Sequence, residues 1–147
     1  MTEERSNVSG DAVPRKARLP GLPARDEPVP IDDQAALAMA RRVVDVAADK
    51  KASDVILLQV SALTSLADYF VICSGGSERQ IDAIADAIVE GLRAEGIRPI
   101  GREGAAASHW VLLDYGSVIV HAFTPPERDY YQLERHWSGA RTVLRVQ

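Results

Sequence analysis

Residues 69–92 read YFVICSGGSERQIDAIADAIVEGL and join an apolar run, a pair of glycines and an amphipathic segment. The apolar run is rich in aromatic and β-branched residues, which predicts a strand over residues 69–74. The glycines end that strand, and Ser77 followed by Gln80 has the spacing of a capping box that starts a helix. Apolar residues then recur at the spacing of a core-facing helical stripe: Ile81, Ile84, Ala85, Ile88 and Leu92. This stretch therefore predicts a strand followed directly by a helix, which Gly96 ends.

Upstream of this unit the pattern predicts a helix and a strand. Residues 33–50 carry apolar side chains at helical spacing, and Asp32 and Asp33 are suitable N-cap residues. Residues 55–60 form a nearly continuous apolar run, typical of a strand covered on both faces. The single cysteine, Cys73, lies inside the next apolar run, so we interpret it as a core residue rather than a reactive thiol.

Downstream the sequence predicts a short strand, a hairpin and a last helix. Residues 97–101 form a strand near an edge of the sheet, because Pro99 lacks a backbone donor. Residues 109–114 and 117–123 form a hairpin around the two-residue turn Tyr115-Gly116. The segment Thr124-Pro-Pro-Glu127 has capping-box spacing with proline at the first helical position, so a helix follows.

The predicted order of elements is helix, strand, strand, helix, strand, strand, strand and helix. This order implies an α/β protein with a mixed β-sheet of about five strands flanked by helices. The domain covers residues 32–140. Residues 1–31 hold five of the eight prolines and show no apolar period, so we expect a disordered Pro-rich tail there. Residues 141–147 are expected to form a C-terminal tail.

The charge distribution limits the kind of partner. The chain carries 17 basic and 21 acidic side chains; residues 1–31 hold five of each, which leaves 12 basic and 16 acidic in residues 32–147, net −4. Phosphate binding needs clustered basic residues, so sequence-specific nucleic-acid binding is not expected, and a basic protein is the favoured contact. No apolar run reaches the roughly 18–20 residues that span a bilayer. We expect a cytoplasmic protein without a membrane partner.

The elbow Gly75-Gly76-Ser77 is the main candidate for catalysis. A helix N-terminus after glycines offers free N–H groups to an anion, and a Gly-Ser pair opening a helix also occurs in nucleotidyltransferases. That chemistry needs closely spaced carboxylates for Mg²⁺, and the sequence contains no Asp-x-Asp. Asp82 and Asp86 share a helix face and are interpreted as solvated. We therefore expect a capped turn and no enzyme, with a nucleotidyltransferase-like enzyme as the rival.

The three histidines do not predict a metal site. His109, His121 and His136 lack the paired spacing of zinc ligands. His121 shares a strand face with Ile119 and Phe123, so we interpret it as a core or interface histidine. Neither a metal nor a cofactor is expected.

The hairpin carries the candidate binding residues. Strand alternation places Trp110, Leu112 and Asp114 on one face, and Val111, Leu113 and Tyr115 on the other. Aromatic residues bordered by an acid are typical of interface hot spots. Alternation equally allows Trp110 to pack under a helix, so both interpretations stay open at this point.

The last helix carries further aromatic residues. Tyr130, Leu133 and Trp137 lie on one helical face, so Tyr130 and Trp137 are expected to point inward. Tyr131 points elsewhere and is expected on the surface.

These segments together resemble the ribosomal silencing factor family, also called Iojap-like. The resemblance spans about residues 35–138 and rests on the stretches LADYFVICSG (66–75), SERQ (77–80), WVLLDYG (110–116), VIVHAF (118–123) and RDYYQLERHW (128–137). It implies a fold similar to nucleotidyltransferases but without their catalytic carboxylates.

The resemblance also implies a function and a partner. Proteins of this family bind the large ribosomal subunit through ribosomal protein fourteen and block docking of the small subunit, notably in starvation; organellar relatives are linked to large-subunit assembly. The residues implied in partner binding are Trp110, Leu112, Asp114 and Tyr115, with Tyr130 and Tyr131 added from the helix. Many relatives have an acid where this chain has Ser117. An exposed apolar hairpin also allows a homodimer of the free protein.

Overall fold

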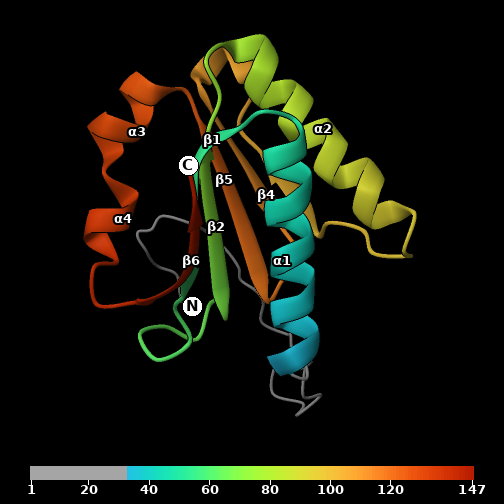
Figure 1. Ribbon diagram of the computed structural model, residues 1–147, viewed down its shortest axis with the longest axis vertical. Coiled ribbons are helices and arrows are strands. Elements are labelled where there is room, and N and C mark those ends of the chain that lie inside the picture. The colour runs from blue at the N-terminus through green and yellow to red at the C-terminus, as the bar shows by residue number, and fades with distance from the viewer. Residues whose placement is uncertain (1–32) are drawn as a thin grey trace. The chain divides into compact units, whose positions relative to one another are not determined.

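A computed structural model describes residues 33–147 of the protein (Figure 1). In chain order its elements are α1 (Asp33–Asp49), β1 (Ser53–Gln59), β2 (Tyr69–Ser74), α2 (Glu78–Arg93), β3 (Gly101–Glu103), the 3₁₀ turn η2 (Ala106–Ser108), β4 (Trp110–Asp114), β5 (Val118–Phe123), α3 (Pro125–Tyr131), α4 (Leu133–His136) and β6 (Arg141–Val146). The tail predicted over residues 1–31 lies outside the described residues. Within them, no helix is both long and apolar enough to cross a membrane.

The strands of this part of the chain form one six-stranded sheet in the order β3-β4-β5-β2-β1-β6. β2 and β5 run parallel, whereas the other neighbouring pairs are antiparallel. Figure 1 shows α1 and α2 on one face of the sheet and α3 and α4 on the other. The predicted α/β class, with a mixed sheet flanked by helices, is confirmed.

The sheet has one strand more than the sequence predicted. Most of the segment 141–147, expected as a tail, forms β6, which pairs with β1 in the register Leu57↔Leu144 and Gln59↔Arg141. An edge strand needs only one neighbour, and its mixed sequence RTVLRV becomes a strand because β1 offers a free edge. The prediction of a C-terminal tail is therefore wrong.

The strand predicted over residues 97–101 is displaced. It covers Gly101–Glu103, and pairing with β4 begins only at the N–H of Ile100, which donates to the Asp114 carbonyl at 2.7 Å. Pro99 has no N–H to donate, so the ladder cannot start before it.

The central strand–helix unit forms as predicted. Ser77 is the N-cap of α2, and its hydroxyl accepts the Gln80 N–H at 3.1 Å. The Gln80 side chain reaches back and accepts the Gly76 N–H at 2.6 Å. A Cβ added to Gly75 would lie 2.9 Å from Ile81 Cγ2, so only glycine fits where strand and helix meet. The elbow is thus a closely packed, capped turn.

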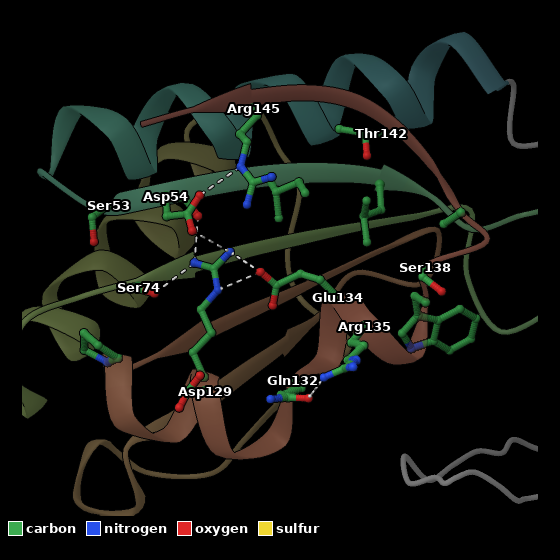
Figure 2. A pocket seen from close by; sticks show the side chains of 16 residues that line it. Ser53, Asp54, Ser74, Asp129, Gln132, Glu134, Arg135, Ser138, Thr142 and Arg145 are labelled. Atoms are coloured by element: carbon green, nitrogen blue, oxygen red, sulfur yellow. Dashed lines mark hydrogen bonds and ion pairs between the residues drawn. The ribbon is translucent and has the colours of Figure 1, made fainter.

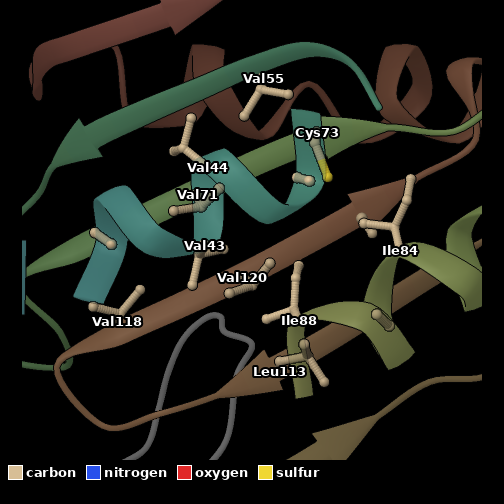
Figure 3. Packing of buried hydrophobic residues seen from close by; sticks show 14 of the residues in the cluster. Val43, Val44, Val55, Val71, Cys73, Ile84, Ile88, Leu113, Val118 and Val120 are labelled. Atoms are coloured by element: carbon tan, nitrogen blue, oxygen red, sulfur yellow. The ribbon is translucent and has the colours of Figure 1, made fainter. Parts of the chain in front are cut away.

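The larger core lies between the sheet and the helices α1 and α2, as Figure 3 shows. The five apolar residues predicted for α2 are all buried there. Cys73 is buried in the same cluster, and this burial raises the pKa of its thiol to about 12. The thiol stays protonated at neutral pH, which agrees with its interpretation as a core residue.

The helix predicted after Thr124 is interrupted. It runs through α3 and ends at Gln132, whose φ of 48° is left-handed, and α4 follows at once. Thr124 is the N-cap, but its side chain makes no cap hydrogen bond, so the predicted capping box is wrong. Because of this break, Tyr130 and Trp137 do not lie on one helical face. Trp137 packs on the sheet as predicted. Tyr130, predicted to point inward, is exposed.

Candidate partner-binding surface

Aromatic rings line the sheet face on the side of α3 and α4. Trp110 of β4 stacks on Phe123 of β5, with ring centroids 5.0 Å apart and planes at 26°. The ring of Tyr131 lies 4.7 Å from that of Trp110, and the ring of Tyr130 lies edge-on, 5.0 Å from Tyr131. Tyr130 is 77% exposed and Tyr131 39%. We call Trp110, Leu112, Tyr130 and Tyr131 the aromatic surface.

Strand alternation in β4 is confirmed. Trp110, Leu112 and Asp114 are partly exposed on the side of α3 and α4. Val111 and Leu113 are buried against the larger core. The sequence left open whether Trp110 packs under a helix or faces outward. In the structure it contacts Tyr131 of α3 and is still partly exposed, so packing does not remove it from solvent.

Asp114 shapes the hairpin turn. Its carboxylate accepts the Gly116 N–H at 2.8 Å, and the Tyr115 N–H donates to the Val118 carbonyl at 2.9 Å. Gly116 has a φ of 85°, a conformation that favours glycine. Because β5 begins at Val118, the loop has three residues, 115–117, and the predicted two-residue turn is one residue too short.

The structure separates Tyr115 from the aromatic surface. It belongs to the larger core on the opposite face of the sheet and is only 7% exposed. Its buried hydroxyl has no hydrogen-bond partner among the described residues, and burial raises its pKa. Of the six residues implied in partner binding, Tyr115 alone points away.

Replacing Tyr115 by phenylalanine is expected to change the free energy of unfolding by less than about 0.5 kcal/mol, or to raise it. The reason is that the lost hydroxyl is buried without a partner, and its removal leaves the ring packing intact. Urea denaturation of the two proteins measures the difference. A loss of more than about 1 kcal/mol, the usual worth of a hydrogen bond, would show that the hydroxyl is bonded.

Strand β3 adds an acid that sequence reasoning missed. Glu103 pairs with Leu112 in the β3–β4 register, so the two share a sheet face, and Glu103 is exposed. Arg102 lies on the opposite face and forms ion pairs with Asp86 at 2.9 Å and Asp82 at 2.8 Å. These aspartates therefore bind a neighbouring strand as well as facing solvent. Only the strand register reveals Glu103, since the strand predicted from the sequence ended at residue 101.

Ser117 stands where the resemblance implies an acid in many relatives. Its side chain is buried, and its carbonyl oxygen accepts the N–H groups of Asp68 at 2.8 Å and Tyr69 at 3.0 Å. The position contributes little to the exposed turn. Negative charge on this side of the hairpin comes from Asp114 and Glu103.

The elbow and the histidines do not form a metal site in the part of the chain that the structure describes. Between residues 33 and 147, no group of three or more His, Cys, Asp or Glu side chains is placed to hold a metal ion. His109 lies beside the elbow, with Nε2 3.3 Å from a carboxylate oxygen of Glu78. His121 is buried, in agreement with the core or interface position predicted for it.

A groove of about 720 Å³ lies between α3, α4 and the strands β1 and β6 (Figure 2). Arg128, one of the residues that line the groove, is buried. Its guanidinium donates to the Asp54 carbonyl at 2.7 Å, to the Ser74 hydroxyl at 2.9 Å and to a Glu134 carboxylate oxygen at 2.8 Å. Hydrogen bonds to the protein thus occupy this cation, which holds the helices on the sheet rather than offering charge to a ligand. Sequence reasoning missed Arg128, because its partners are distant in the chain.

A family model and individual relatives both match this chain. Residues 33–147 match the family model described as ribosomal silencing factor during starvation. Ribosomal silencing factor RsfS of Halalkalibacterium halodurans is 41% identical over 113 residues, covering 77% of this chain and 94% of that protein. RsfS of Bacillus subtilis is 42% identical over 92 residues, covering 63% and 78%.

A solved structure agrees with these matches. The crystal structure of a Chromobacterium violaceum protein superposes with a TM-score of 0.69 at 33% identity, covering 74% of this chain and 92% of that one. The family match covers the whole described domain, including strand β6. The chain belongs to the ribosomal silencing factor family.

Proposed function

We propose that this protein represses translation by binding the large ribosomal subunit through ribosomal protein fourteen. The bound protein sterically blocks association with the small subunit, especially under starvation. Membership of the ribosomal silencing factor family supports this proposal. The observation that carries it is the aromatic surface, where large apolar side chains are partly or fully exposed.

The chemistry of this surface suits a protein partner. Trp and Tyr are among the residues most enriched in binding hot spots, because they bury a large area at a small cost in entropy. Asp114 and Glu103 border Leu112 with negative charge, which favours a basic partner and disfavours acidic ones. Steric blocking requires only a stable footprint, so no catalytic group is needed.

The contact residues we propose are Trp110, Leu112 and Asp114 of β4 with Tyr130 and Tyr131 of α3. Tyr115 supports them from the other face, where its ring anchors the hairpin in the core. The free protein would bury the same surface in a homodimer, so dimerisation and ribosome binding would compete.

Replacing Trp110 by alanine is expected to weaken binding to large subunits about thirtyfold, the effect of losing a hot spot worth about 2 kcal/mol. The substitution removes the sheet ring whose centroid lies 4.7 Å from that of Tyr131. Cosedimentation of purified variants with large subunits measures the affinity, and light scattering of the same samples reports the homodimer.

Val146→Ala serves as the matched control. Val146 is also an exposed apolar residue, but it lies on β6, at the opposite edge of the sheet from β3 and β4. Its replacement should leave the affinity unchanged. If a folded Trp110→Ala variant bound large subunits as tightly as the unaltered protein, the aromatic surface would not be the binding site.

A second function, assistance in large-subunit assembly, has support from one relative. The mouse protein named mitochondrial assembly of ribosomal large subunit protein 1 is 31% identical to this chain, which spans about half of its length. Ribosome profiles of a deletion strain separate the two functions. Accumulating precursor particles favour assembly, whereas continued translation after nutrient loss favours silencing.

A further inference from the structure

His121, a buried histidine of β5, bonds to the partly exposed Trp110 of β4. Nδ1 of His121 accepts the indole N–H of Trp110, with 3.3 Å between the two nitrogens. The residues lie on neighbouring strands, β5 and β4, where His121 pairs with Leu112, so the bond runs diagonally across the ladder. It connects the interior of the sheet to the aromatic surface.

Aromatic rings hold the imidazole in place. Phe123 lies nearly parallel to it at 9°, with centroids 6.2 Å apart, and Phe70 meets it edge-on at 5.1 Å. His121 is 4% exposed, and this burial lowers the pKa of its imidazole to about 3. The side chain is therefore neutral at physiological pH. A neutral imidazole has one N–H, and since Nδ1 accepts the hydrogen bond of the indole, that N–H is on Nε2.

The other nitrogen of His121 makes the position unusual. Nε2 is buried and has no hydrogen-bond partner among the described residues. A buried unsatisfied donor is unfavourable, and an aliphatic side chain would fill the site without it. The feature that a histidine supplies here and an aliphatic residue lacks is the Nδ1 acceptor directed at Trp110.

We propose that His121 is a positioning residue that holds the indole of Trp110 in the orientation that meets the partner. This inference rests on the proposed function, because it takes Trp110 as a contact residue. Without the acceptor, only the ring contacts with Phe123 and Tyr131 would orient the indole, and binding would have to order it further.

The hydrogen bond also restricts what the partner offers to Trp110. Because the indole N–H is used within the protein, the partner meets the carbon face and edge of the ring. Apolar side chains and the cations of Arg or Lys suit such a ring face, whereas a hydrogen-bond acceptor aimed at the indole nitrogen does not. This agrees with a basic protein as partner.

Two variants separate the acceptor from simple packing. His121→Asn keeps an acceptor oxygen near the position of Nδ1. His121→Leu introduces a side chain of similar size that has no hydrogen-bond acceptor. In His121→Leu the Trp110 indole N–H resonance should shift and exchange faster with water, and affinity for large subunits should fall about fivefold, the scale of one hydrogen bond. In His121→Asn, most of the slow exchange of the indole N–H and most of the affinity for large subunits should be retained. Trp137→Phe identifies which indole resonance belongs to Trp110.

A measurement on the unaltered protein does not depend on the folding of variants. Nitrogen NMR of the imidazole should show Nδ1 unprotonated and Nε2 protonated; the opposite tautomer would overturn the inference. An unchanged Trp110 indole resonance in folded His121→Leu would overturn it too. If Trp110→Ala left ribosome binding intact, Trp110 would not be a contact residue and the proposed function would lose this support. The NMR measurements would still show separately whether His121 bonds to the indole of Trp110.

Discussion

Replacing Arg128 by alanine is expected to lower the free energy of unfolding by about 3 kcal/mol, the usual cost of removing one partner from a buried ion pair. The Arg128 side chain is 8% exposed and that of Glu134 27%, so water screens this pair weakly. Without the guanidinium, the Glu134 carboxylate loses its cation, and the Ser74 hydroxyl and Asp54 carbonyl lose a donor (Figure 2). Each of these groups is then only partly solvated, which makes the loss large.

Urea denaturation of Arg128→Ala tests this prediction, with Arg135→Ala as the control. Arg135 is an exposed arginine of α4 that donates to Gln132 on the surface at 3.0 Å. Its removal should cost less than about 0.5 kcal/mol, as for other surface substitutions. If the two alanine variants were equally stable, Arg128 would not hold α3 and α4 on the sheet.

Acid is expected to destabilise the protein through His121. Burial lowers its pKa from 6.5 to about 3, so between these values the unfolded chain binds a proton that the folded protein does not. Stability therefore falls as the pH drops from 6.5 towards 3, by about 2 kcal/mol between pH 7 and pH 5 for this one group. The rings that contact His121, those of Phe70, Trp110 and Phe123, carry no charge that would offset this cost.

His121→Leu isolates this effect, because it removes the titrating group. Urea denaturation at pH 7 and pH 5 should show a loss for the unaltered protein about 2 kcal/mol larger than for the variant. The pKa of Asp54 is also lowered, chiefly by the hydrogen bond from Arg145, but that carboxylate loses its contribution only below about its ordinary value of 3.8. An equal pH dependence in both proteins would show that His121 gains its proton without unfolding.

Patterns within short segments predicted much of this fold. The strand at residues 69–74, the N-cap at Ser77 and the buried stripe of α2 all follow from side chains within a few residues of one another. The shared face of Trp110, Leu112 and Asp114 follows from strand alternation in the same way. In contrast, Tyr130 was assigned inward because helical spacing assumes an unbroken helix, and Gln132 interrupts it.

The sequence by itself was sufficient for the α/β class, the capped elbow and the two faces of the hairpin, because hydrogen bonds and periodicity between near neighbours specify these features. Packing between distant segments was needed for the rest. β6 forms on the free edge of β1. The register of β3 and β4 places Glu103 on the same face as Leu112. Arg128 donates to the carbonyl of Asp54, which lies 74 residues away in the chain. The same packing buries Tyr115 and leaves Trp110 partly exposed, since only the assembled sheet determines which of its faces the helices cover completely.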